Sequence, residues 1–474
     1  MSEKEQHASE FKLISCTLSK GDDTKPTALE RDMIASLSVH ESIVSPFMGA
    51  TMMISDSKGL LNTFPVEGGE NIEIKLKTTW EKEPIRYKFK IFKIVSRIIK
   101  NKQQLYILAL TSEEVFTNET VRVEKLQTGD PTDIVTSLIR KELKSSKKVF
   151  SEKTKFEVRH LPGRSRPFDI IANLTKRSVS NKAVYKNVKK NIRGSKTKTT
   201  QEIKGSAGYF FWESRRGYNY YSIDALCDEQ GGKFSAPDLN SEPFGPYVEG
   251  IANTDVSADQ RRLIENFTFK TEVDVLSSLR KGKYSSLMVF FNYSTGQYEE
   301  YTYNIKDSYK SMSHLGKQEN VSPIPSSQLD LSSKPTRIMS ALLDHEAWFN
   351  DPQVADPNQN TENPNKYADW VKYYASQSIA RYDLLTNQEA ELVIPGNPFI
   401  SAGDKVNVMI TNKLADKERL KKPWDKESSG IYLVKEISHL FDFTTGTNGI
   451  LKSTLQLFRD SYGMKTDPSD KGDK

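Results

Sequence analysis

Two residue types that often carry chemistry are scarce in this chain. Its 474 residues include 2 cysteines, Cys16 and Cys227, and 6 histidines. Two cysteines cannot form a disulfide framework or a cysteine-rich metal site, and we expect both to be small buried residues. This cysteine usage is typical of a protein assembled in a reducing cytoplasm.

Long hydrophobic runs are also missing. The best run, LMVFFNY at residues 287–293, has the length of a strand, whereas a membrane helix needs about 18 apolar residues. The N-terminus reads MSEKEQHASE, which is charged and lacks the apolar stretch of a signal peptide. We therefore expect neither a secretory signal nor a membrane anchor.

A strong charge of one sign is lacking as well. Lys+Arg number 68 and Asp+Glu number 62, which leaves a formal net charge of +6. This mild excess falls short of the dense positive field of a dedicated nucleic-acid binder. The hydrophobic fraction of 36% is enough to build cores. At about 150 residues per domain, the length predicts roughly three domains.

The common catalytic motifs are absent. The chain contains no G-x-x-x-x-G-K-[ST], no H-E-x-x-H and no G-x-S-x-G. The histidines occur singly, at His7, His40, His160, His314, His345 and His439. Asp344, His345 and Glu346 are adjacent and would point in different directions on a helix, so a surface charge cluster explains them better than a metal site. We expect His439 to be a hydrogen-bonded structural residue, and we predict no catalytic, cofactor-binding or metal-ligating residue, no cofactor and no enzymatic activity.

The first 112 residues carry the two-residue alternation of β-strands. It is clearest in IEIKLKT at residues 72–78, where isoleucine and leucine alternate with charged residues. Similar segments occur at 11–18, 35–39, 51–59, 87–91 and 105–110. Several short strands without a long helical pattern predict an antiparallel barrel or sandwich over residues 1–112.

Helical spacing begins near residue 113. Asp130 followed by Pro131 is a helix start, and a second helix is predicted from Pro167. Two aromatic strands, 209–213 and 218–223, are predicted to form a hairpin. Residues 113–227 are therefore expected to form an α/β domain.

A basic segment interrupts this domain. Between Lys176 and Lys204 lie ten basic residues and one acid, Glu202. We expect a mobile basic loop, residues 181–205, that is ordered only by a partner. Binding of phosphate backbones is the alternative, but Tyr185 is the one aromatic residue in the segment, which disfavours a single-strand site.

The rest of the chain divides into a mixed part and a second β part. Residues 228–366 are predicted to be a mixed inserted domain with strands at 286–293 and 298–305. Residues 367–462 begin with a helix over 367–380 and continue with strands at 391–394, 405–410, 430–441 and 450–458. Residues 463–474 are a charged tail. The predicted fold class is mainly β with α+β insertions.

A series of short segments resembles a known family when taken in order. The segments are 42–49 (SIVSPFMG), 53–59 (MISDSKG), 64–74 (FPVEGGENIEI), 167–175, 208–217 (GYFFWESRRG), 275–284, 393–397 (VIPGN), 402–404 (AGD), 430–434 (GIYLV), 437–439 (ISH) and 455–461. Together they resemble the central baseplate hub proteins of contractile-tailed, T-even-like bacteriophages. Residues 181–205 and 306–366 depart from that pattern.

The resemblance implies two tail-tube-like antiparallel β-barrels in one chain and a homotrimer. Three such chains would form a pseudo-sixfold ring that joins a hexameric tail tube to a trimeric spike. A cyclic trimer can meet a hexamer evenly only when each subunit presents two equivalent docking elements. The implied partners are further copies, the tail spike protein, the tail tube or tube-initiator protein, the tape measure protein and baseplate wedge proteins.

The implied location is the virion, after assembly in the host cytoplasm. DNA would pass through the channel only in transit, so we expect few basic residues on the channel wall, where cations would retain phosphates. Two alternatives stay open at this point. One is a tandem-barrel hub of a related contractile injection or secretion apparatus, and the other is a tail-associated hydrolase.

Overall fold

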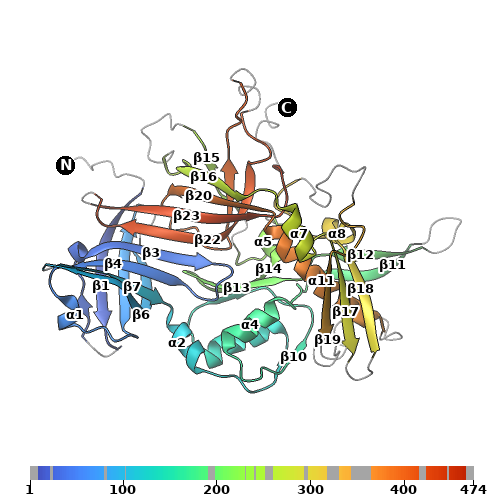
Figure 1. The fold of residues 1–474 in the computed structure, drawn as a ribbon, viewed down its shortest axis with the longest axis horizontal. Coiled ribbons are helices and arrows are strands. Elements are labelled where there is room, and N and C mark those ends of the chain that lie inside the picture. Colours follow the sequence, from blue (N-terminus) through green and yellow to red (C-terminus); the bar gives the residue numbers. More distant parts are fainter. Residues whose placement is uncertain are drawn as a thin grey trace.

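The computed structural model shows a mainly β protein with helical and mixed parts, which confirms the predicted fold class (Figure 1). The structure describes residues 9–21, 25–79, 83–101, 103–190, 198–229, 231–239, 242–250, 260–292, 297–317, 330–342, 365–415, 423–445 and 448–465. No helix in these ranges is long and apolar enough to cross a membrane.

The N-terminal strands form a closed ring. Its members are β1 (Glu10–Ser19), β3 (Ile34–Ser42), β4 (Gly49–Asp56), β5 (Asn71–Thr78), β6 (Ile85–Lys100) and β7 (Gln103–Thr111), with two C-terminal strands, β22 (Gly430–Asp442) and β23 (Gly449–Arg459). The order around this first ring is β1–β5–β6–β7–β4–β3–β22–β23, and β23 pairs with β1 again. Small elements decorate it: β2 (Thr27–Ala28), a 3₁₀ turn (Arg31–Met33), α1 (Leu60–Thr63) and α2 (Glu113–Thr120).

The alternation in the sequence explains why these strands close around a core. Ile72, Ile74 and Leu76 of β5 are fully buried, whereas the charged residues between them face outward. Buried apolar residues from every strand fill the interior of the ring. Phe441 of β22 and Phe443, which directly follows that strand, belong to the same core. The first barrel predicted over residues 1–112 therefore needs strands from the far end of the chain to close.

A second ring surrounds a separate core. It contains β15 (Phe244–Val248), β16 (Asn266–Thr271), β20 (Gln388–Pro395) and β21 (Lys405–Met409), together with β22 and β23. The order is β15–β21–β22–β23–β20–β16, and a bridge between Val248 and Leu263 closes it. The core includes Tyr247, Leu392, Val406, Tyr432 and Leu455.

The β22–β23 hairpin belongs to both rings. Residues 430–433 of β22 pair with β21 in the second ring, and residues 436–442 pair with β3 in the first ring. The register shifts between Val434 and Glu436, where the hairpin passes from one ring to the other. Such a bulge bends a strand and increases its twist, which lets one strand serve two barrels.

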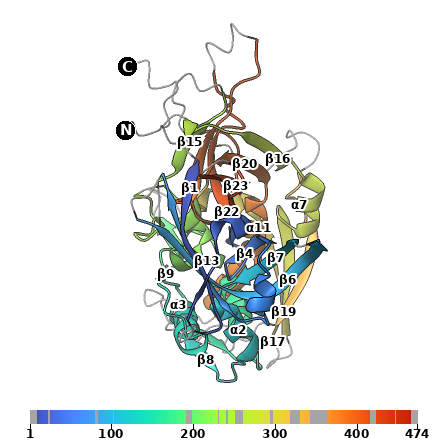
Figure 2. The same cartoon turned by 90° about the vertical axis from the view of Figure 1, so that its left-hand side faces the viewer.

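A central part packs against both rings. It contains β8 (Gln127–Gly129), α3 (Pro131–Ser137), a π-helical turn (Leu138–Glu142), β9 (Val149–Ser151), β10 (Val158–His160), α4 (Pro167–Thr175), β13 (Tyr209–Ser214), β14 (Gly217–Ser222) and α5 (Ile223–Cys227). The predicted helix starts and the β13–β14 hairpin are confirmed. The Asp130 side chain accepts a hydrogen bond of 2.8 Å from the Thr132 amide and caps α3. Seen from the first-ring side, the second ring lies above and α2, α3 and β8 lie at the bottom (Figure 2).

A third sheet lies at the right of Figure 1. It consists of β17 (Ser285–Asn292), β18 (Gln297–Asn304) and β19 (Arg337–Leu342), in the order β18–β17–β19. The long helix α11 (Asn365–Leu385) covers one face of this sheet, beside α7 (Val275–Lys281), α8 (Ile305–Ser308) and a 3₁₀ turn (Tyr309–Ser311). Met288, Phe290 and Tyr303 share a core with Tyr374 and Leu384 of α11.

The structure corrects two expectations. The segment predicted to be a mobile basic loop, residues 181–205, contains an antiparallel ribbon of β11 (Val184–Lys190) and β12 (Lys198–Lys204). Valine, isoleucine and threonine, which favour strands, recur in both segments: Val184, Val188, Thr199, Thr200 and Ile203. The second difference is that β15 and β16 fall inside residues 228–366 yet pair with β21 and β20. The second barrel is therefore not confined to residues 367–462, because strand pairing joins segments that are distant in sequence.

Candidate functional site

The described part of the chain contains no group of three or more His, Cys, Asp or Glu side chains placed to hold a metal ion. His439 is buried, with Nδ1 2.8 Å from Ser453 Oγ and Nε2 3.2 Å from Ile400 O. Burial lowers the pKa of His439 to about 4. The prediction of a hydrogen-bonded structural histidine is confirmed. The Asp344–Glu346 cluster lies outside the described residues.

Both cysteines are buried and unpaired, as predicted. Burial raises the pKa of the Cys16 thiol and that of the Cys227 thiol to about 12. Since the thiolate is the nucleophile, both residues are poorly suited to covalent chemistry at neutral pH.

A cluster of polar side chains is buried at the junction between the two rings. Glu41 on β3 accepts a hydrogen bond of 2.8 Å from the Arg215 amide and one of 3.1 Å from the Ala402 amide. These contacts tie the first ring to the β13–β14 turn and to the loop that precedes β21. Arg216 and Asp404 form an ion pair beside it. Burial raises the pKa of Glu41 to about 7, although the two amides oppose the shift.

Trp212 completes this junction. Its indole Nε1 donates to Ala402 O at 2.9 Å, and its ring packs on Gly403. Gly403 has φ +89°, and a Cβ there would lie 2.4 Å from Trp212 Cζ2. The glycine is required by both its left-handed backbone and this close approach. The junction thus fixes one ring relative to the other.

A second buried network fastens α11 to the end of β23. Arg381 is fully buried, and its guanidinium lies 2.9 Å from Asp460 Oδ2 and 3.4 Å from Asp224 Oδ1. It also donates to Ser313 O at 2.6 Å. His314 Nδ1 lies 2.8 Å from the same Asp460 carboxylate. Burial acts to raise the pKa of Asp460, but His314 and Arg381 hold it well below its usual range.

A third polar cluster ties the first ring to the central part. Glu213 of β13 is 2% exposed and accepts hydrogen bonds from the Met48 amide at 3.0 Å and Ser112 Oγ at 2.6 Å. Its other oxygen lies 2.6 Å from Lys147 Nζ, which also contacts Glu114. In the three networks the charged groups bind one another or backbone amides, so each network serves to position elements of the fold.

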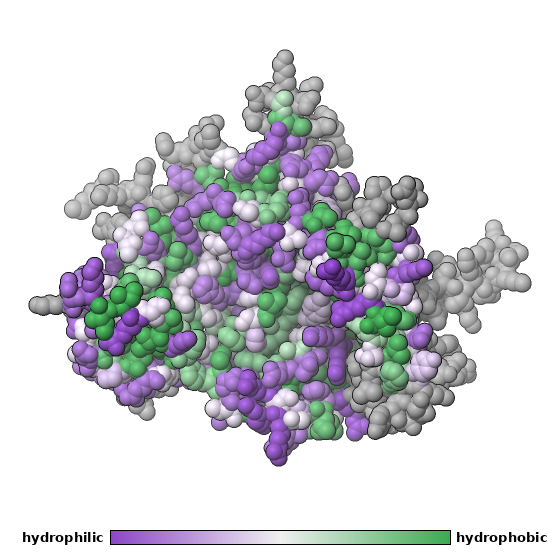
Figure 3. Space-filling model, viewed as in Figure 1, coloured by the Kyte–Doolittle hydropathy of each residue, from purple (hydrophilic) through white to green (hydrophobic). Residues whose placement is uncertain are grey.

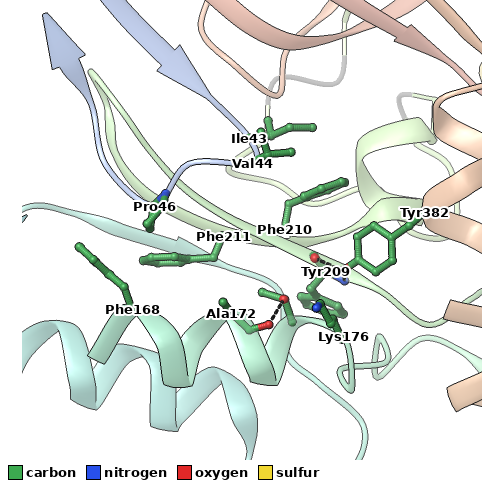
Figure 4. A pocket seen from close by; sticks show the side chains of 11 residues that line it. Ile43, Val44, Pro46, Phe168, Ala172, Lys176, Tyr209, Phe210, Phe211 and Tyr382 are labelled. Carbon is green, nitrogen blue, oxygen red and sulfur yellow. Dashed lines mark hydrogen bonds between the residues drawn. The ribbon is translucent and has the colours of Figure 1, made fainter. Parts of the chain in front are cut away.

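An apolar pocket of about 240 Å³ lies where the β3–β4 connection meets α4 and β13 (Figure 4). Ile43, Val44 and Pro46 face Phe168 and Phe210 across it. At its inner end, Tyr382 of α11 accepts a hydrogen bond of 3.1 Å from the Tyr209 amide. Thr175 and Lys176 also line the pocket, but the Thr175 hydroxyl donates to Ala172 O at 2.8 Å, and most of the lining is apolar. The pocket therefore suits an apolar side chain better than a reaction.

Sequence reasoning missed the buried charges, Arg381 and Asp460 above all. One signal was present: Arg381 lies seven residues after Tyr374 and three before Leu384, on the same apolar helix face. A charged residue on an apolar helix face indicates a buried ion pair. The partner carboxylates, however, lie in segments whose proximity the sequence does not reveal.

No known family model and no curated protein matches this chain. In structure it is similar to a tail protein from Neisseria meningitidis MC58, with a TM-score of 0.48 and 10% identity over 95% of this chain and 97% of that one. It is similar to the 43 kDa tail protein of prophage MuSo2 from Shewanella oneidensis, with a TM-score of 0.46 and 8% identity over 94% and 99%. It is also similar to the E. coli c3393 protein, described as a component of the type VI secretion system, with a TM-score of 0.38 and 7% identity over 97% and 79%. These scores and identities are too low to transfer a function.

Proposed function

We propose that this chain is a structural protein of a phage tail baseplate, its central hub. In this proposal three copies form a pseudo-sixfold ring that joins a hexameric tail tube to a trimeric spike and surrounds the DNA exit channel. Residues 1–112 and 367–462, with β15 and β16, supply the two tube-like modules. Residues 113–227 and the rest of 228–366 brace them.

One observation carries the proposal: a single chain builds two β-rings that share a hairpin. Two ring modules per chain are what a trimer needs to present six docking elements to a hexamer. The Glu41 junction supports the proposal because it holds the two modules in one fixed relation, and a fixed relation is necessary if both are to meet one flat tube. The ordered resemblance of short segments to phage hub proteins supports it independently.

The role is mechanical. The charged groups of the three buried networks bind one another or backbone amides, and both cysteines are buried. The implied partners are the spike, the tube or its initiator, the tape measure protein and the wedge proteins. The implied location is the virion. The related hub of a contractile injection or secretion apparatus would use the same tandem rings with different neighbours.

The test is to co-express the chain with the tube-like and spike-like proteins encoded beside it. We expect a complex with three copies of this chain, and a threefold map in which the two rings of each copy alternate around one channel. Rings of Lys or Arg around that channel would contradict the expectation that the channel wall carries few basic residues. A complex in which only one ring per chain faces the tube would refute the adaptor role.

A further inference from the structure

One strand of the first ring is apolar on both faces. β5 alternates isoleucine or leucine with charged residues, as expected for a strand with solvent on its outer side. β7 instead reads LYILAL over residues 105–110. Tyr106, Leu108 and Leu110 are buried in the ring, so Leu105, Ile107 and Ala109 point outward. Continuous apolar runs are typical of strands that are covered on both sides.

The strands on either side of β7 extend this apolar surface. On the outer side Leu105 pairs with Ile98 of β6, and Ile107 lies between Val95 of β6 and Met53 of β4. Phe92 lies nearby on β6. We call this set the β7 outer face: Met53, Phe92, Val95, Ile98, Leu105 and Ile107. Ile98 is 59% exposed and Phe92 is 52% exposed, so no described part of the chain covers them.

The β7 outer face runs into a recess. A groove of about 530 Å³ separates Phe92 and Ala109 from Val115 and Phe116 of α2. Most of the surface exposed in the groove is apolar, although His40 and Glu119 are among the residues that line it. Lys93, which pairs with Ala109, lies beside it. An apolar surface with a recess beside cations such as Lys93 suits a protruding apolar surface that carries an acid.

The chain carries such a surface on its third sheet. α11 covers the face that holds Met288 and Phe290, so the opposite face of β17 is free of it. We call that set the β17 outer face: Leu287, Val289, Phe291, Tyr298 and Ile338. Ile338 is 70% exposed and Tyr298 is 63% exposed. Glu300, which pairs with Val289, is the acid within it.

The two faces lie on different parts of the molecule. The β6–β7 hairpin lies toward the left end of the long axis in Figure 1, and the β17–β19 sheet lies toward the right end. In the same view, hydrophobic atoms are exposed over both ends (Figure 3). One chain therefore cannot close these faces on each other. Two copies can, with the β7 outer face of one against the β17 outer face of the next.

We propose that these two faces form the head-to-tail contact between neighbouring copies of this chain. The inference rests on the proposed ring and names the surfaces that close it. A contact between two unlike patches can repeat from copy to copy, and it closes a ring of three when each contact turns the next copy by 120°, whereas a patch that pairs with itself stops at a dimer. Lys93 of one copy then faces Glu300 of the next, and this pairing fixes the register of the contact.

The test uses two exposed positions, one on each face, and measures mass by light scattering. Ile98→Asp places a charge on the β7 outer face, and Ile338→Asp places one on the β17 outer face. We expect the unmodified chain to be a trimer and each variant to be a monomer. An equimolar mixture of the two variants retains one intact pair of faces and should give a 1:1 heterodimer and nothing larger. That heterodimer also shows that both variants are folded.

Lys77→Asp and Lys334→Asp are the matched controls, because both lysines are exposed and lie outside the two faces. Both controls should remain trimers. If only Ile98→Asp dissociates the assembly, the β7 outer face pairs with itself and the head-to-tail contact is wrong. Trimers that survive both variants overturn the assignment of faces and leave the proposed hub intact. A chain that is monomeric at every concentration, alone and with its tube and spike proteins, overturns both proposals.

Discussion

The buried guanidinium of Arg381 offers a direct measure of what holds α11 in place. Replacing Arg381 by methionine keeps the length and most of the volume of the side chain but removes its positive charge. Asp460 and Asp224 then remain in the protein interior without the guanidinium that contacts both of them. Removal of one partner from a buried ion pair costs about 3–5 kcal/mol, because the remaining charge stays desolvated.

The assay is urea unfolding at pH 7, followed by tryptophan fluorescence and circular dichroism. We expect Arg381→Met to lower the free energy of unfolding by about 3–5 kcal/mol. The exposed Arg280→Met serves as the control and should change it by less than about 0.5 kcal/mol. Adding Asp460→Asn to Arg381→Met should recover part of the loss, since it removes one of the stranded charges.

The pH dependence gives a second readout of the same network. The pKa of Asp460 is depressed in the folded protein, so its contribution is present above its unfolded pKa and is lost as the pH falls. Arg381→Met should therefore flatten the acid side of the stability profile. A loss below about 1 kcal/mol, or an unchanged acid profile, would show that this network does not fasten α11.

Three further predictions concern single sites. Burial raises the pKa of Glu41 to about 7, so the folded state binds more protons than the unfolded state between about pH 4.5 and 7. The free energy of unfolding should therefore fall by up to about 3 kcal/mol as the pH rises through that window. Glu41→Gln should abolish this fall, as measured by denaturation series at pH 5 and pH 8. Gly403→Ala should lower the unfolding midpoint, by a free energy of about 2 kcal/mol or more, because its Cβ would lie 2.4 Å from Trp212; an unshifted midpoint would mean that the junction is loosely packed. Cys16 and Cys227 should react with an aromatic disulfide reagent only after unfolding, and rapid labelling of the native protein would contradict their burial.

Local features were predictable because local forces determine them. Asp130 and Pro131 mark the start of α3, and the alternation at Ile72 and Ile74 predicts a strand with one buried face. Each depends on residues within a few positions. The β7 outer face was also readable, since its apolar run breaks the alternation of the neighbouring strands, but a run alone does not show which side a partner covers.

The remainder depends on contacts between distant segments. β16 resembles any short aromatic strand until its pairing with β20 places it in the second ring. Glu41 lies in an ordinary alternating strand, and only the folded chain brings the amides of Arg215 and Ala402 to its carboxylate. Contacts of this kind depend on the topology of the fold, and a pattern of residues within a short stretch of sequence does not reveal the topology.

Because both rings share the β22–β23 hairpin, neither ring can close until the end of the chain has been synthesised. Ser38 on β3 meets Ser438 on β22, a separation of 400 residues along the chain. The ribosome synthesises the chain from the amino end. The edge strands β1 and β3 therefore lack their partners, β23 and β22, until nearly the whole polypeptide has emerged. Contacts this remote are slow to form, and open strand edges attract other chains meanwhile. Premature termination anywhere upstream of Gly430 would therefore leave both barrels incomplete, with neither module finished.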